Sequence, residues 1–262
     1  MPLYTDQLSR SIEISAQPKR IISVVPSQTE LLYDLGLREQ VIGITKFCVY
    51  PKEWFETKTR IGGTKQLNIQ KIKELKPDLI FANKEENTKE DIEELEKEFP
   101  LWISDVHDLS SAYAMISDVG KIVGKENESA LLLKNIEFQF SKFSVPQRKI
   151  RTAYLIWKDP YLTVGNDTFI HQMLSHAGFE NIFSDTTRYP QIELNELIER
   201  NCELLLLSSE PYPFKQKHID ELQPSLRGIK ILLADGELFS WYGSRMLKAP
   251  FYFQKLYVAA TQ

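Results

Sequence analysis

The sequence predicts an α/β fold with two Rossmann-like lobes, each built on a mainly parallel sheet, joined by a single long helix. Short apolar strands alternate with helices early in the chain and again after Pro146, which is typical of parallel sheets covered by helices. Between these halves, residues 126–143 continue a helical pattern with no strand before them, and would form a helix ~27 Å long. We therefore expect domains at residues 1–125 and 144–262, with residues 126–143 as the linking backbone helix.

The elements of the first lobe follow from apolar runs and their boundaries. Residues 20–25 (RIISVV) end at Pro26 and predict a buried parallel strand. A helix should follow at once, because Ser27 and Glu30 have capping-box spacing and Gly36 can end it. The remaining expectations here are a hairpin at 4–14, strands at 41–45, 78–82 and 101–104, and helices at 68–76, 88–99 and 110–124.

The second half repeats this construction. We expect strands at 152–157, 204–208 and 229–234, a helix at 169–177 closed by Gly178, and a last helix from about Ser244. Residues 68–74 lead into an apolar strand, and residues 193–199 lead into another at the same spacing. This similarity between the two segments supports two lobes of similar construction, although ordinary α/β patterning also explains it.

Composition narrows the possible partners. The 262 residues are 42% hydrophobic and 26% charged, with a net charge of -4, which argues against a nucleic-acid surface and against membrane binding. No apolar run approaches the roughly 20 residues that a spanning helix needs. The N-terminus MPLYTD lacks the pattern of a secretory leader. We expect a monomer, cytoplasmic as sequenced, or periplasmic or surface-anchored if a leader has been removed.

The sequence lacks the motifs of several common kinds of enzyme and metal site. No glycine-rich turn fits a phosphate loop, and no Gly-x-Ser-x-Gly elbow is present. Cys48 and Cys202 have no Cys-x-x-Cys partner, so a structural thiol is expected at each, with pocket lining as the alternative for Cys48. His171 and His176 are five residues apart and would lie on different faces of a helix. We expect neither a bound metal nor an intrinsic cofactor.

Aromatic residues recur where predicted strands end. Phe47 and Tyr50 follow one strand, Trp157 follows another, and Tyr189 and Trp241 lie in later loops. Open α/β sheets bind ligands outside the carboxyl ends of their strands, and aromatic rings supply large contact areas there. The alternative interpretation is that these rings simply cover the ends of the core.

Together these segments resemble the substrate-binding proteins of cobalamin and ferric-siderophore ABC importers. The resemblance rests on RIISVVPSQTELLYDLGL (20–37), VIGIT followed by Tyr50, RIGGTKQLNIQKIKELKPDLIFA (60–82), GFENIF (178–183) and WYGSRML (241–247). It covers nearly the whole chain, and the first and third segments together are specific. It implies a non-catalytic receptor with a rigid connecting helix.

The resemblance also implies a ligand site in a cleft between the lobes. The ligand would be a corrinoid, a haem or a ferric chelate, stacked against Tyr189 and Trp241. The residues that would line this site are Phe47, Tyr50, Gly63, Thr64, Lys65, Trp157, Tyr189, Trp241, Tyr242 and Arg245.

Two departures from the family pattern bear on ligand and partner. Cobalamin binders often have tryptophans where this chain has Thr64 and Asn83. Fewer aromatic side chains would therefore surround the ligand here. The family docks on its ABC permease through one glutamate per lobe, and these positions are the neutral Gln70 and Asn195 here. Carboxylates nearby in the sequence could substitute: Glu86, Glu90, Glu196 and Glu210.

Three other functions stay open. The chain could be a cytoplasmic carrier or sensor that no longer docks on a permease. It could also be a cleft enzyme, for which Glu237 and Arg245 are the candidate acid–base pair. A protein-interaction role for the charged helix at 88–99 is the third possibility.

Overall fold

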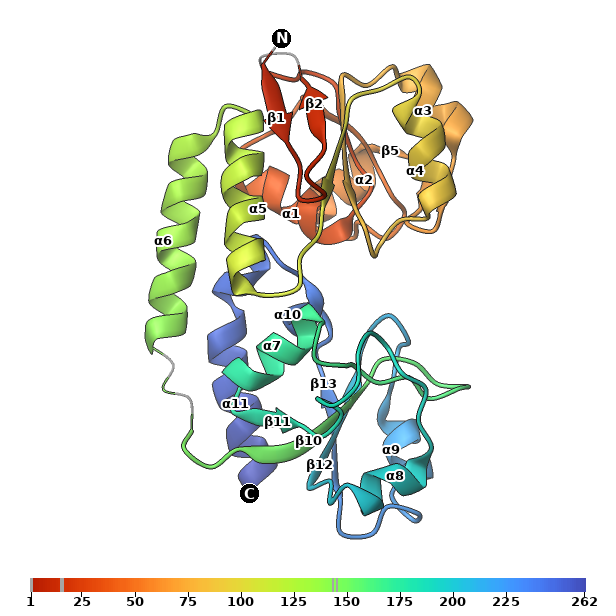
Figure 1. The fold of residues 1–262 in the computed structure, drawn as a ribbon, viewed down its shortest axis with the longest axis vertical. Coiled ribbons are helices and arrows are strands. Elements are labelled where there is room, and N and C mark those ends of the chain that lie inside the picture. Colours follow the sequence, from red (N-terminus) through yellow and green to blue (C-terminus); the bar gives the residue numbers. More distant parts are fainter. Residues whose placement is uncertain (1, 15–16, 143, 145) are drawn as a thin grey trace. The chain divides into compact units, whose positions relative to one another are not determined.

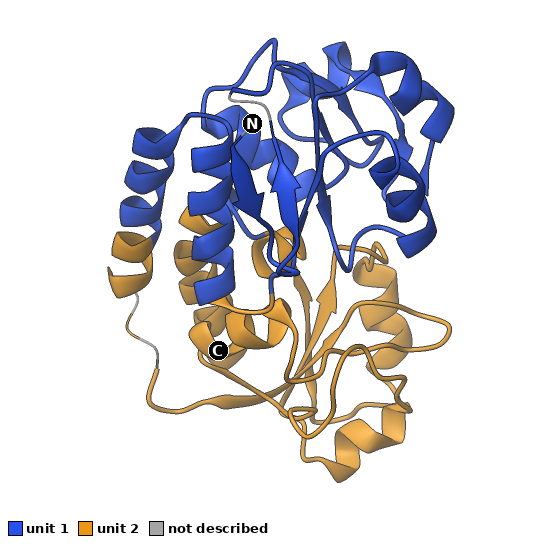
Figure 2. Ribbon diagram, turned by 45° about the horizontal axis from the view of Figure 1, so that its top comes forward, with its two compact units in different colours: residues 1–106, 110–136, 242–245 blue, residues 107–109, 137–241, 246–262 orange. Residues whose placement is uncertain are grey.

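The structure is a computed structural model that describes residues 2–14, 17–142, 144 and 146–262. The chain divides into two compact units, shown in Figure 2. Unit 1 comprises residues 1–106, 110–136 and 242–245. Unit 2 comprises residues 107–109, 137–241 and 246–262. Each unit therefore includes a short segment from a distant part of the sequence.

Unit 1 contains a five-stranded parallel sheet. Its strands lie in the order β5 (Thr59–Arg60), β4 (Val41–Ile44), β3 (Ile21–Ser23), β8 (Leu79–Asn83) and β9 (Leu101–Ser104). All residues of β3, β8 and β9 are buried, as their continuous apolar runs predict. The predicted parallel sheet of the first half is confirmed.

The helices of unit 1 are α1 (Pro26–Asp34), α2 (Lys52–Thr57), α3 (Ile69–Leu75), α4 (Lys89–Glu96) and α5 (Leu109–Ile122). In Figure 1, α3 and α4 lie on one side of the sheet and α5 lies on the other. The predicted capping box of α1 is wrong. Val25 is the N-cap residue and makes no side-chain cap, because its apolar side chain has no acceptor for the N–H groups of the first turn, and Pro26 takes the first helical position.

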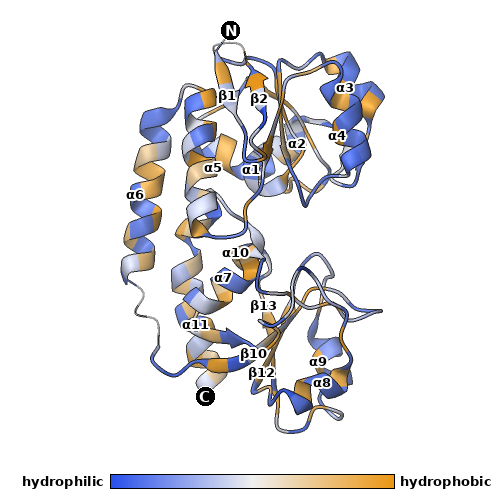
Figure 3. Cartoon of the chain, in the orientation of Figure 1, coloured by the Kyte–Doolittle hydropathy of each residue, from blue (hydrophilic) through white to orange (hydrophobic). Residues whose placement is uncertain are grey.

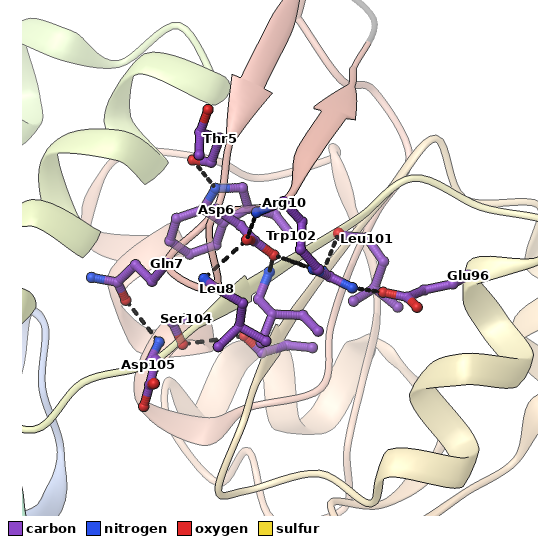
Figure 4. Close-up of polar contacts among 12 residues, drawn as sticks. Thr5, Asp6, Gln7, Leu8, Arg10, Glu96, Leu101, Trp102, Ser104 and Asp105 are labelled. Carbon is purple, nitrogen blue, oxygen red and sulfur yellow. Dashed lines mark hydrogen bonds and ion pairs between the residues drawn. The ribbon is translucent and has the colours of Figure 1, made fainter.

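The N-terminal hairpin is tied to β9 by a buried carboxylate. Strands β1 (Leu3–Thr5) and β2 (Ser11–Glu13) pair antiparallel, as expected. Asp6, at the end of β1, accepts hydrogen bonds from the backbone N–H groups of Leu8 at 3.0 Å and Arg10 at 2.9 Å. The Arg10 guanidinium pairs with the same carboxylate at 2.6 Å and also donates to the Leu101 carbonyl. Figure 4 shows this network around Asp6.

Unit 2 contains a separate parallel sheet of four strands. Their order is β11 (Phe179–Asn181), β10 (Ile150–Leu155), β12 (Leu204–Ser208) and β13 (Lys230–Ala234). In Figure 1, α7 (Phe169–His176) and α11 (Ala249–Thr261) flank one side of this sheet, and α8 (Leu194–Glu199) and α9 (Gln216–Leu222) flank the other. Figure 3 shows hydrophobic colouring along β12, a central strand of the unit 2 sheet, and β13, which lies at its edge.

The remaining elements are short, apart from α6 (Glu126–Lys142). The division between the units falls within α6, between residues 136 and 137, while residue 143 lies outside the described residues. A two-stranded hairpin of β6 (Gly62–Gly63) and β7 (Gln66–Leu67) follows β5 in unit 1. In the last part of the chain, α10 (Glu237–Ser240) precedes a 3₁₀ turn at Ser244–Leu247.

Candidate functional site

The loop after β4 presents two aromatic rings from unit 1. Phe47 is 50% exposed and Tyr50 is 42% exposed. Between them, the Cys48 thiol is fully buried and lies 3.1 Å from the Thr29 hydroxyl and 3.2 Å from the Thr45 hydroxyl. Burial raises the pKa of this thiol, and the two hydroxyls partly offset the rise. Cys48 is thus a structural anchor that holds the loop while the rings on either side face outward.

The β6–β7 hairpin lies against this loop. The Lys46 N–H donates to the Gly62 carbonyl at 2.8 Å. A Cβ atom at Gly62, where φ is +103°, would lie 2.4 Å from the Gln66 carbonyl oxygen, so only glycine fits. A Cβ atom at Gly63 would approach a Phe47 ring carbon to 3.1 Å. The turn between the strands consists of buried Thr64 and exposed Lys65, so the predicted glycine, threonine and lysine positions do cluster beside Phe47.

Arg245 reaches unit 1 from the far end of the chain and is held by a carboxylate. Its Nε and one terminal nitrogen each donate to Glu30 at 2.7 Å. Both side chains are about nine-tenths buried, at 9% and 11% exposure. The guanidinium carbon lies 4.3 Å from the centre of the Tyr50 ring, a distance at which a cation–π contact forms. Arg245 therefore supports Tyr50, and its charge is neutralised by Glu30.

Tyr242 also lies in unit 1 and is buried. Burial raises the pKa of its hydroxyl well above the usual range, and the Glu86 carboxylate raises it further. The hydroxyls of Ser27 and Ser104 act in the opposite direction. Because Ser104 ends β9 and Ser27 lies in the first turn of α1, Tyr242 lies at the carboxyl edge of the unit 1 sheet.

In unit 2, Trp157 and Tyr189 follow the pattern of rings beyond strand ends. Trp157 lies just after β10, is 40% exposed, and contacts Tyr212 edge-on at 5.8 Å between ring centres. Tyr189 is half-buried, with the Arg188 guanidinium 5.6 Å from its ring centre. The Gly165 N–H donates to the Arg188 carbonyl at 2.7 Å and holds this loop against the body of unit 2.

Trp241 is buried in unit 2 and anchored by Glu210. The indole N–H donates to a Glu210 carboxylate oxygen at 2.9 Å, and the Ser240 hydroxyl donates to the same oxygen at 2.6 Å. Only 7% of Trp241 is exposed, so little ring surface is available beside Glu210. The sequence had suggested Glu210 as a substitute docking carboxylate, whereas in the structure it orients Trp241.

The predicted site residues thus form two groups, one on each unit. The unit 1 group is Phe47, Tyr50, Gly63, Thr64, Lys65, Tyr242 and Arg245, and the unit 2 group is Trp157, Tyr189 and Trp241. Sequence reasoning missed the partners that hold these residues, namely Glu30 and Glu210. Glu30 had a local explanation as a capping residue, and no sequence signal joins it to an arginine 215 residues away.

The two predicted docking positions are exposed on helices of different units. Gln70 lies in α3 and donates to Glu74 within the helix at 3.2 Å. Asn195 lies in α8 and is exposed. Next to it, Glu196 accepts from the Glu193 backbone N–H in a capping box, so that carboxylate has a structural role.

Over residues 2–14, 17–142, 144 and 146–262, no three side chains of the His, Cys, Asp or Glu type cluster closely enough to hold a metal ion. In the same part of the chain, no helix has the length and apolar character needed to cross a membrane. The enzyme alternative also weakens, because Arg245 in its proposed acid–base pair is bound to Glu30.

Two α/β units whose strand ends carry exposed aromatic rings define a protein of the substrate-binding class. The sequence profile of the family described as periplasmic binding protein matches residues 21–228. The chain belongs to this family of non-catalytic substrate-binding proteins, which confirms the resemblance inferred from the sequence.

Curated relatives cover most of the chain. An uncharacterized ABC transporter substrate-binding lipoprotein of Bacillus subtilis is 27% identical over 77% of this chain and 67% of its own length. A vitamin B12-binding protein of Vibrio parahaemolyticus is 26% identical over 79% of this chain and 77% of its own length.

Solved structures show the same fold at lower identity. The vitamin B12-binding protein BtuF of Vibrio cholerae is 21% identical, with a TM-score of 0.74 over 94% of this chain and 98% of that protein. A possible iron-binding protein of Staphylococcus epidermidis gives a TM-score of 0.77 at 23% identity, over 94% of this chain and all of that one. The predicted fold class is confirmed.

Proposed function

We propose that this chain is the receptor of an ABC importer and binds a large metal chelate, either a corrinoid, a haem or a ferric siderophore. The observation that carries the proposal is the placement of exposed aromatic rings beyond strand ends in both units: Phe47 and Tyr50 in one, Trp157 in the other. Such rings suit a bulky ligand with flat apolar faces. The vitamin B12-binding relatives and the structural likeness to haem-binding proteins point the same way.

On each unit, the residues at these strand ends would offer contacts to the ligand. Phe47, Tyr50 and Trp157 would supply ring surface, and Thr64 and Lys65 would supply polar contacts. Trp241 is held by Glu210, so we propose that it presents a ring edge or its small exposed surface rather than a free stacking face. Arg245 would act indirectly, by supporting the Tyr50 ring.

Direct titration tests the proposal. Cyanocobalamin, haemin and a ferric hydroxamate are titrated into the protein by calorimetry, and binding of at least one is expected. Phe47→Ala and Trp157→Ala should each weaken that ligand by roughly 30-fold, because loss of an anchoring aromatic ring costs about 2 kcal/mol or more. The matched control is Phe138→Ala, which removes an equally exposed ring on α6. Equal effects of all three substitutions, or binding of none of the ligands, would refute the proposal.

The permease partner and the compartment belong to the same proposal. Charged pairs steer association and fix register at interfaces, so neutral Gln70 and Asn195 at the docking positions would weaken permease binding. A receptor that acts without tight docking, as a carrier or sensor, is the second candidate, favoured by these two residues. Several relatives are named as periplasmic or as lipoproteins, and cell fractionation of the native host would show whether this chain shares that location.

A further inference from the structure

Unit 1 holds a carboxylate, Glu86, in a rigid turn at the carboxyl edge of its sheet. The turn follows β8 and is closed by Asn83, whose side-chain oxygen accepts the N–H groups of Glu85 at 2.8 Å and Glu86 at 3.1 Å. Asn87 fastens its other end, donating to the carbonyls of Val24 at 3.3 Å and Thr64 at 3.1 Å. The turn is thereby attached to the β6–β7 hairpin, and Glu86 lies among the residues proposed to bind ligand.

The Glu86 carboxylate has no hydrogen-bond donor of its own within the described part of the chain. Neither a hydrogen bond nor an ion pair to its side chain is present there, although its backbone N–H donates to Asn83. Burial raises the pKa of this carboxyl, while the nearby Lys65 ammonium lowers it in part. Lys65 itself donates to the Glu85 carbonyl. A half-buried carboxylate without donors is an acceptor available to an outside group.

A second acceptor, on the Gln28 side chain, is connected to this turn through Ser104 and Asn83 and also lacks a donor. Gln28 is only 1% exposed, and its side-chain oxygen receives no hydrogen bond from the described residues. Its amide nitrogen donates to Ser104, whose own hydroxyl donates to the Ala82 carbonyl at 3.2 Å. Ser104 also accepts from Asn83 at 2.9 Å. The Gln28 side-chain oxygen is thus a buried acceptor without a donor, next to the Ser104 hydroxyl that also accepts from Asn83.

The Arg245 charge beside the Tyr50 ring is already neutralised. Arg245 donates twice to Glu30, so it is a poor partner for a ligand carboxylate. Two acceptors without donors, the half-buried Glu86 carboxylate and the buried Gln28 oxygen, therefore lie at this edge. Two exposed cations oppose this excess of acceptors: Lys65, and Lys46, whose ammonium lies 5.0 Å from the centre of the Phe47 ring.

We infer that Glu86 is a specificity-determining residue that accepts hydrogen bonds from amide N–H groups of the ligand and disfavours ligands with carboxylates at that position. The inference rests on the proposed function and narrows it. Among metal chelates, Glu86 would favour a corrinoid over a haem. The ring edge of a corrinoid carries primary amides, whereas the ring edge of a haem carries two propionates. A ligand carboxylate facing Glu86 would meet a like charge and would bring no donor.

The test compares two ligands that differ at one group. Cyanocobalamin and its monocarboxylic acids, in which one side-chain amide is hydrolysed, are titrated by calorimetry against the wild-type protein and Glu86→Gln. One of the acid derivatives should place its carboxylate at Glu86. The wild type should bind cyanocobalamin roughly tenfold or more tightly than this derivative, which is the size of effect expected for a hydrogen bond to a charged group. In Glu86→Gln the preference should fall to about twofold, because a neutral amide both accepts and donates. The matched control, Glu90→Gln on exposed α4, should keep the wild-type preference.

The outcomes separate this inference from the proposed function. Tighter binding of haemin than of cyanocobalamin by the wild type would leave the receptor function standing and overturn the role of Glu86. An amide preference that is equal in wild type and Glu86→Gln, or a preference for the acid form through Lys65, would also overturn it. If no chelate binds, the proposed function fails, and the inference fails with it. An unchanged unfolding midpoint of Glu86→Gln shows that a loss of preference reflects the ligand contact.

Discussion

Removing the carboxylate of Glu30 should destabilise unit 1 strongly. The Glu30–Arg245 pair has two hydrogen bonds of 2.7 Å and side chains about nine-tenths buried. Removing one partner of a buried pair typically costs 3–5 kcal/mol, because the remaining charge stays in a poorly solvated place. Glu30→Gln keeps one acceptor for the guanidinium. We therefore expect a loss of about 3 kcal/mol in the free energy of unfolding.

Urea unfolding followed by tryptophan fluorescence measures this loss, since Trp54 and Trp102 are both buried in unit 1. The matched control is Glu128→Gln, which breaks an exposed pair with Lys125 and should cost less than about 1 kcal/mol.

A second variant checks the reasoning about charge burial. Replacing both residues of the pair with methionine should cost less than Glu30→Gln alone, because an apolar pair leaves no buried charge. A loss below about 1 kcal/mol in Glu30→Gln, or a double variant as unstable as the sum of its single changes, would contradict this account.

Three further predictions concern the hairpin anchor, a buried histidine and the permease. Asp6→Asn should lower the free energy of unfolding by about 2 kcal/mol, because a buried acceptor of backbone N–H groups loses its charge. Thermal melts measure this loss, and Asp118→Asn, which changes a partly exposed ion pair, is the control. Burial holds the pKa of His218 below its ordinary value of 6.5, so the unfolded chain binds the proton more readily. Stability should then fall as pH drops below about 6.5, and less steeply in His218→Gln; equal slopes would exclude this cause. Changing both Gln70 and Asn195 to Glu should create salt-sensitive binding to the host's permease in pull-downs, whereas tight binding by the unaltered chain would show that docking does not need these charges.

The regular elements could be predicted because their signals are local. Residues 101–104 and 204–208 form strands with the expected bounds, since each apolar run is enclosed by polar or helix-forming residues. The long helix was predicted at 126–143 and is observed as Glu126–Lys142. In contrast, α9 was missed, because its sequence QKHIDEL is short and mostly polar and its two buried residues give little periodicity.

The site was predictable in position but not in its interactions. Aromatic residues after strands indicate where rings gather, and Phe47, Tyr50 and Trp157 are indeed exposed there. Burial of Trp241 against Glu210 depends on how α10 packs on the loop after β12, which no local pattern encodes. The importance of Glu86 likewise comes from the lack of a donor around it, and a missing contact has no sequence signal.

The two buried cysteines allow the opening of each unit to be measured separately by thiol labelling. Cys48 lies in unit 1 and Cys202 in unit 2, and both thiols are buried. Burial raises the pKa of Cys48 and raises that of Cys202 to about 11, so little of the reactive thiolate exists near neutral pH. A thiol reagent can therefore modify each residue only when its own unit opens. The rates of labelling at the two positions, separated by peptide mass spectrometry, would report the opening free energy of each half independently and show which half a ligand stabilises.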